Sequence, residues 1–224
     1  MPQLTAIVGA AAERCNIPTD EFRVVPDPDD EQTLLVFYPM ATPNGDYLRP
    51  YVKIESGAKS ALDPNAVATI EPYVNDDFPD GDLRVPNVTT VDPQRTFWDK
   101  VIILHGLRSW FDRRKELKGD GQRVSRHYYD LYRLLIADVG AEASANSELG
   151  ENCIAHAALF FNRPDYDLAT AKPGTFRLSP HDGMVDALRR DYSAMSGMIF
   201  GKVPDFDAIL EAIAELEDRL NATG

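Results

Sequence analysis

The pattern of apolar residues changes at Asp92-Pro93, and this change limits the folds that the chain can adopt. Before it, short runs rich in Val, Leu, Phe and Tyr are separated by turn residues, which is typical of β-strands. After it, apolar residues recur at the three- and four-residue spacing of helices. The sequence therefore predicts an α/β protein in which a sheet-containing part, residues 1–92, precedes a helical part, residues 93–224.

The N-terminal part is predicted to hold one helix and several strands. An alanine-rich segment favours a helix over residues 3–15. Turns are predicted at residues 26–31 and 43–46, which are rich in Pro, Asp, Asn and Gly. Residues 75–92 are rich in Asp, Pro and Asn and are predicted to be irregular. Strands are expected at residues 21–25, 32–38, 47–55 and 66–73.

The C-terminal part is predicted to be a set of helices. Asp92-Pro93 is a good helix start, because an Asp side chain caps free N–H groups and Pro is accepted in the first turn. Apolar residues at helical spacing follow it: Phe97, Val101, Leu104, Leu107 and Phe111. Further helices are expected at residues 123–138, 148–161, 181–200 and 205–220, the last with an apolar stripe of Phe206, Ile209, Ile213, Leu216 and Leu220.

Composition limits where the protein works and what it binds. The 224 residues carry 23 basic and 36 acidic side chains, a net charge of −13, so most of the surface would repel nucleic acid. One basic stretch at residues 108–126 is a candidate contact, and a solvated helix end of mixed charge is its alternative. No apolar run reaches the roughly 18 residues of a membrane span, and no basic leader opens the chain. We expect a cytoplasmic protein, with Cys15 and Cys153 as buried free thiols.

The predicted strand at residues 47–55 places a lysine and a carboxylate on one face. Because side chains alternate along a strand, Tyr51, Lys53 and Glu55 point the same way. One interpretation of Lys53 and Glu55 is a surface ion pair, which would contribute little stability. The other is a phosphate contact and a metal ligand at the edge of a cleft.

Two further segments combine charge with helical spacing. Lys100 lies within a strongly apolar helix, where it would either reach out to water or neutralise a triphosphate. His105 has no partner at metal-ligand spacing and is predicted to be a packed or surface histidine. Asp130 lies one helical turn from Arg126 and from Arg133, which allows either an ordinary helix-surface ion pair or a phosphate-binding cluster with neighbouring tyrosines for base stacking.

Several phrases, in this order, resemble the AbiEii/AbiGii family of nucleotidyltransferase toxins. The resemblance covers nearly the whole chain and includes the closing pattern from Met198 through Pro204, Phe206 and Ile209 to Asn221. The phrases are Tyr-Val-Lys-Ile-Glu-Ser-Gly-Ala-Lys-Ser at residues 51–60, Thr-Phe-Trp-Asp-Lys at 96–100, Ser-Arg-His-Tyr-Tyr-Asp-Leu-Tyr-Arg-Leu at 125–134 and Asp-Tyr-Ser-Ala-Met at 191–195.

The resemblance implies a polymerase-β-like nucleotidyltransferase core in residues 1–92 and a helical C-terminal domain in residues 93–224. It implies transfer of nucleotides from a nucleoside triphosphate to an acceptor such as tRNA, with Mg²⁺, by a toxin paired with an antitoxin. Lys100 and Asp130 resemble catalytic residues of the family. Lys53, Lys100 and Arg126 would contact the nucleotide, and Glu55 would be a metal ligand.

The chain also departs from the family pattern. Family members begin with a Gly-Gly-Ser/Thr turn and an Asp-x-Asp strand whose carboxylates hold the metal ions. Asp27-Pro-Asp29 matches the Asp-x-Asp pattern, but it lies in a proline-rich turn. The chain therefore looks N-terminally truncated relative to the family. Two functions therefore stay open: a transferase active when the missing segment is supplied, or an inactive remnant that binds nucleotide or protein. An uncovered sheet face is expected to cause self-association or to bind a partner chain.

Overall fold

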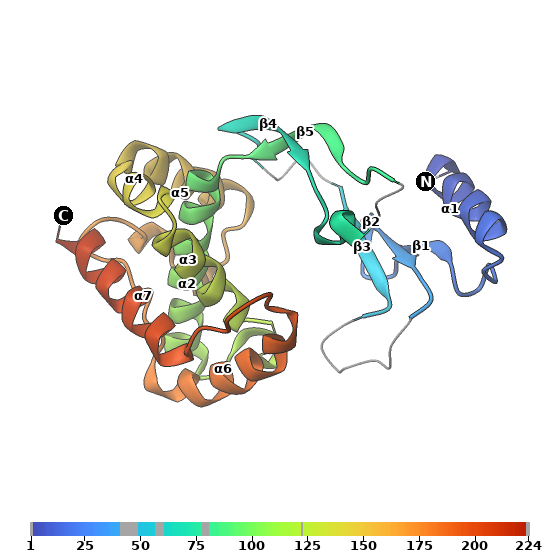
Figure 1. Cartoon of the computed structure of the whole chain (residues 1–224). Helices are drawn as coiled ribbons and strands as arrows, with labels where there is room; N and C mark the ends of the chain where they lie inside the picture. Colours follow the sequence, from blue (N-terminus) through green and yellow to red (C-terminus); the bar gives the residue numbers. More distant parts are fainter. Residues whose placement is uncertain (1, 41–48, 57–60, 78–80, 122, 223–224) are drawn as a thin grey trace. The chain divides into compact units, whose positions relative to one another are not determined.

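The computed structural model divides the chain into two compact units, Met1–Ser60 and Ala61–Gly224 (Figure 1). It describes residues 2–40, 49–56, 61–77, 81–121 and 123–222, and for residues 31 and 120 it describes the backbone alone. The predicted turn at residues 43–46 lies outside this range. The expected boundary after residue 92 is the point where strands give way to helices, whereas the compact units divide after Ser60.

The described residues of the first unit form a three-stranded antiparallel sheet and one helix. Its elements are α1 (Pro2–Cys15), β1 (Arg23–Asp27), β2 (Asp30–Phe37) and β3 (Tyr51–Glu55). The sheet order is β1-β2-β3, and Leu35 pairs with Val25 on one side and with Lys53 on the other. Helix α1 packs near β1 and buries Val8 and Ala12, which lie one turn apart. The predicted helix, the first two strands and the turn at Pro28–Asp29 are confirmed within a few residues.

The second unit opens with an antiparallel hairpin of β4 (Asn65–Ile70) and β5 (Val85–Val91), with the 3₁₀ turn η1 (Tyr73–Asp77) between them. The prediction that residues 75–92 are irregular was therefore wrong for β5. Its Val and Thr residues favour an extended chain, and pairing with β4 satisfies the backbone. The hairpin leads into the first long helix, where the Asp92 carboxylate accepts a hydrogen bond from the N–H of Gln94 at 2.7 Å.

Six α-helices follow among the described residues of the second unit. They are α2 (Pro93–Arg114), α3 (Ser125–Ile136), α4 (Val139–Ala145), α5 (Ser147–Phe160), α6 (Asp182–Met195) and α7 (Phe206–Asn221). Short 3₁₀ turns link them at Lys118–Gly121 (η2), Pro164–Tyr166 (η3), Leu168–Thr170 (η4) and Ser196–Met198 (η5). All predicted helices are confirmed, and α4 is an additional one. It is short and rich in Ala, Gly and Ser, so it has no apolar stripe that would have predicted it.

The core of the second unit lies around α2 and α3, with α4 to α7 packed about them (Figure 1). Helix α2 buries Phe97, Val101 and Leu104 completely, and α3 contributes Tyr128 and Leu131. The predicted stripe of α7 is buried along its whole length. Each large apolar side chain removed from water contributes about 1.5–3 kcal/mol, so this packing fixes α2 against α3.

The chain is a mixed helix-and-sheet protein, as the sequence predicts, and both of its small sheets are antiparallel. None of the helices among the described residues is long and apolar enough to cross a membrane. Cys153 is buried and free, and burial raises the pKa of its thiol to about 11. Cys15 is exposed near the end of α1, so the expectation that both thiols are buried was wrong for Cys15.

Candidate functional site

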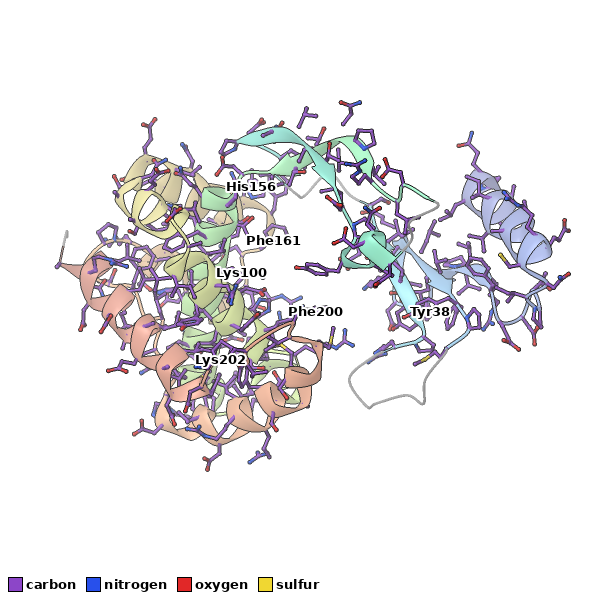
Figure 2. The ribbon with its side chains drawn as sticks, in the orientation of Figure 1. Tyr38, Lys100, His156, Phe161, Phe200 and Lys202 are labelled. Carbon is purple, nitrogen blue, oxygen red and sulfur yellow. The ribbon has the colours of Figure 1, made fainter. Side chains whose placement is uncertain are left out.

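Two of the predicted site residues meet at the contact of α2 and α3. The Nζ of Lys100 on α2 lies 2.7 Å from Oδ2 of Asp130 on α3, and Figure 2 labels this lysine. The Lys100 side chain is 18% exposed and that of Asp130 is 40% exposed. The ammonium group therefore points toward a carboxylate while part of the side chain stays exposed, which is the arrangement of a half-buried ion pair and not of a lysine that simply extends into water.

His127 is the third polar group at this contact. Its Nδ1 lies 3.4 Å from Nζ of Lys100, and it precedes Asp130 by three positions, so both face α2. Burial lowers the pKa of His127 to about 3, helped by the positive charges of Lys100, Arg126 and Lys118 and opposed by Asp191. The imidazole is therefore neutral near pH 7. The His-x-x-Asp spacing in the sequence indicates that His127 and Asp130 share a helix face, but the contact of His127 with Lys100 was not predicted.

Asp191 of α6 holds the N-terminal end of α3. Its carboxylate accepts hydrogen bonds from the N–H groups of Arg123 and Ser125 at 2.7 and 2.8 Å, and from the Ser125 hydroxyl at 2.6 Å. The residue at the start of α3, Val124, offers no capping side chain of its own. Asp191 thus takes the place of a local cap and fixes the helix that carries His127 and Asp130. In the sequence, Asp191 could have been singled out because it opens the Asp-Tyr-Ser-Ala-Met phrase that resembles the toxin family.

Arg126 is exposed in the first turn of α3, one helical turn before Asp130. Within the described part of the chain, Asp130 forms an ion pair with Lys100 and none with Arg126 or Arg133, so the helix-surface pairing is not adopted. The neighbouring Tyr128 is fully buried and its pKa is raised by that burial, which places it in the core and excludes it from base stacking.

Three of the seven basic residues in the stretch 108–126 form ion pairs within their own unit. Arg108 pairs with Asp112 at 3.0 Å, Arg113 with Asp167 at 3.3 Å and Arg114 with Asp165 at 2.6 Å. These carboxylates neutralise part of the charge that a nucleic acid would meet. The mixed-charge alternative therefore describes this stretch better than a nucleic-acid contact does.

Lys53 and Glu55 lie in the first unit, on one face of β3 as predicted. Their side chains are 3.1 Å apart, and Lys53 also lies 3.3 Å from Oδ2 of Asp27. Glu55, and secondarily Asp27, raise the pKa of Lys53. With Lys53 44% and Glu55 70% exposed, the geometry is that of a surface ion pair. Their convergence with Lys100, Asp130 and Arg126 on one surface stays a prediction.

His105 is confirmed as a packed histidine. Its Nδ1 accepts a hydrogen bond from the N–H of Arg177 at 3.2 Å, and its Nε2 lies 3.1 Å from the Thr170 hydroxyl. The ring is fully buried, and this burial lowers its pKa. His105 therefore joins α2 to the segment before α6 and is not available to bind a ligand.

The resemblance to the toxin family implies Mg²⁺, and the described side chains do not form a site that fits it. A divalent magnesium ion prefers several oxygen ligands in near-octahedral geometry. No group of three or more potential ligands occurs within the described ranges, and Glu55 is engaged with Lys53. We therefore derive no catalytic step through a metal ion.

The fold and the site define a mixed helix-and-sheet protein whose helical unit holds a lysine, a carboxylate and a neutral histidine at the half-buried contact of α2 and α3. A family model described as the nucleotidyl transferase AbiEii toxin of a type IV toxin–antitoxin system matches residues 1–212. The chain therefore belongs to the AbiEii family of nucleotidyl transferase toxins. Neither the curated proteins nor the solved structures that we compared with the chain include a match.

Proposed function

We propose that this protein is a component of a nucleotidyltransferase toxin, whose reaction transfers nucleotides from a nucleoside triphosphate to an acceptor such as tRNA. Family membership supports the reaction class, and the contact of Lys100 with Asp130 is the observation that carries the site. An ammonium group with a solvent-facing side suits the phosphates of a nucleotide, because a compact charge on a flexible stem can follow them.

Each site residue has a proposed role. Lys100 neutralises charge on the triphosphate, and Asp130 holds the lysine in place when no nucleotide is bound. Arg126, exposed on the same helix as Asp130, and Lys53 on β3 are proposed as further phosphate contacts. Glu55 would serve as a ligand of Mg²⁺ only if it left Lys53 and further oxygen ligands, which the described residues do not supply, joined it. In this proposal residues 1–92 correspond to a polymerase-β-like core and residues 93–224 to a helical domain.

The proposed function includes a protein partner. Type IV toxin–antitoxin membership supports a cognate antitoxin as the second component. The strongly acidic surface, with its net charge of −13, would repel an RNA acceptor except at local basic positions such as Arg126.

Nucleotide binding tests the proposal most directly. We would titrate the whole chain with non-hydrolysable triphosphate analogues in a calorimeter, comparing the unchanged protein with Lys100→Met. The methionine keeps the length of the side chain and removes its charge, and we expect at least about 10-fold weaker binding, which corresponds to about 1.4 kcal/mol. Lys172→Met is the matched control, because Lys172 is an exposed lysine outside α2 and α3. Equal affinity in all three proteins would overturn the proposal.

A second candidate function is an inactive module that binds nucleotide or protein. It is favoured by the Asp27-Pro-Asp29 segment, where the Asp27 carboxylate is bound to the N–H of Asp29 at 3.0 Å and approaches Lys53 at 3.3 Å. A carboxylate used in this way stabilises a hairpin turn. Nucleotide binding without turnover, in the presence of Mg²⁺ and tRNA, would support this candidate.

A further inference from the structure

The ammonium group of Lys100 has more hydrogen-bond donors than Asp130 can use. A protonated lysine carries three N–H groups and no acceptor. One N–H is directed at Oδ2 of Asp130, 2.7 Å away, and the next polar atom is Nδ1 of His127 at 3.4 Å. Lys100 therefore lies between two groups of α3 that follow one another at a spacing of three residues.

The chemistry of this contact determines the tautomer of His127. Because the lysine only donates, Nδ1 must accept, and the ring proton must be on Nε2. A charged imidazolium would instead place a donor and a like charge next to the ammonium group. The cations around the ring come from three elements, with Lys100 on α2, Lys118 on η2 and Arg126 on α3, and Asp191 on α6 is the acidic group that opposes them.

With two acceptors in place, the orientation of the ammonium group is defined. Its two polar neighbours both belong to α3, which leaves one of its three N–H groups for a ligand, and the side chain as a whole is 18% exposed. Asp130 by itself would let the ammonium group rotate about a single contact. A second acceptor on the same rigid helix removes that freedom before the ligand arrives.

We propose that His127 is a positioning residue for Lys100. Its neutral imidazole accepts a hydrogen bond from the lysine and fixes the direction of the remaining N–H. That this N–H meets the phosphates of a nucleoside triphosphate rests on the proposed function. The positioning itself concerns this chain without any ligand, so the two statements are tested separately.

The first experiment determines the tautomer and the protonation state of the His127 imidazole. Long-range ¹⁵N–¹H correlation spectra of the whole chain, with the His127 signals assigned through His127→Asn, report which ring nitrogen is protonated. We expect a protonated Nε2 and a hydrogen-bonded, unprotonated Nδ1 from pH 5 to 8. In Lys100→Met the Nδ1 resonance should move downfield as its donor is lost. A proton on Nδ1 would overturn the inference. An Nδ1 chemical shift that is the same in Lys100→Met as in the unchanged protein would also overturn it.

The second experiment measures binding of a non-hydrolysable triphosphate analogue. His127→Leu removes the acceptor, and we expect about 5-fold weaker binding. His127→Asn keeps an acceptor oxygen near the position of Nδ1, and binding should stay within about 2-fold of the unchanged protein. His181→Asn, at the start of α6, is a control with no expected effect. Equal losses in His127→Leu and His127→Asn would contradict positioning through Nδ1. If the unchanged protein binds no nucleotide, the proposed function fails, and the spectra alone decide the positioning.

Discussion

Nζ of Lys100 lies 2.7 Å from Oδ2 of Asp130, although 30 positions separate the two residues along the chain. The contact links α2 to α3 and is half-buried, so its strength should exceed that of a fully exposed ion pair. We expect a coupling free energy of about 1 kcal/mol in a double-mutant cycle of Lys100→Met and Asp130→Asn, measured by urea unfolding. Strictly additive effects would show that the pair contributes nothing to stability.

Asp191 should be important for stability even though it lies outside the proposed phosphate contacts. Asp191→Ala removes three hydrogen bonds and leaves the N-terminal N–H groups of α3 without their acceptor. We expect a loss of about 2 kcal/mol in the free energy of unfolding. Asp186→Ala is the matched control, since Asp186 is exposed on the same helix and should change stability by less than about 0.5 kcal/mol. Similar losses in both variants would contradict the capping role.

The protonation of His127 should make stability depend on pH. Its pKa is lowered from the ordinary 6.5 to about 3, so between these values the unfolded chain binds a proton that the folded chain does not. Unfolding then takes up a proton, and the free energy of unfolding falls as the pH falls, by up to about 1.4 kcal/mol per pH unit.

Urea unfolding between pH 6.5 and pH 4 measures this dependence. His127→Asn should flatten it because no ring remains to be protonated. Lys100→Met should flatten it in part, because one of the charges that lower the pKa of His127 is gone. An identical slope in the unchanged protein and in His127→Asn would show that other groups cause the acid sensitivity.

The outer strand of the first unit should mediate association. β3 lies at one edge of its sheet, and its side chains Val52 and Ile54 are 55% and 39% exposed. Apolar side chains on an open edge strand favour pairing with another chain. Light scattering at high concentration should detect self-association, and Val52→Thr with Ile54→Thr should reduce it. Val67→Thr in the β4–β5 hairpin is the control. A strictly monomeric unchanged protein would exclude this surface as a site of self-association.

The purified 224-residue chain is expected not to transfer nucleotides to tRNA at a significant rate. Asp27-Pro-Asp29 matches the Asp-x-Asp pattern that the resemblance implies for the metal site, but the Asp27 carboxylate is used within a turn. The measurement is labelling of tRNA from radioactive triphosphates with Mg²⁺. Labelling that depends on Mg²⁺ and disappears in Asp130→Ala would contradict this prediction and point to another acidic pair, such as that at Asp27 and Asp29.

The sequence predicted most elements because each depends on local patterns. The spacing of Phe206, Ile209, Ile213, Leu216 and Leu220 allows only a helix to bury them on one side, and α7 buries all five. β5 was missed because its Asp- and Pro-rich surroundings indicated a loop, and pairing with β4 outweighed them. Helix α4 was missed because a short helix of small residues has no clear periodicity.

The sequence alone indicated the family and singled out Lys100 and Asp130 as candidate site residues. It also predicted, from the alternation of side chains along a strand, that Lys53 and Glu55 lie on one face. These follow from motifs and from spacing along a single element. Only the tertiary structure showed that Asp130 turns to Lys100 instead of to Arg126, that His127 is the second acceptor, and that Asp191 caps α3. The physical reason is that these contacts join helices far apart in the chain, and the packing of the apolar faces of α2, α3 and α6 decides which polar side chains meet.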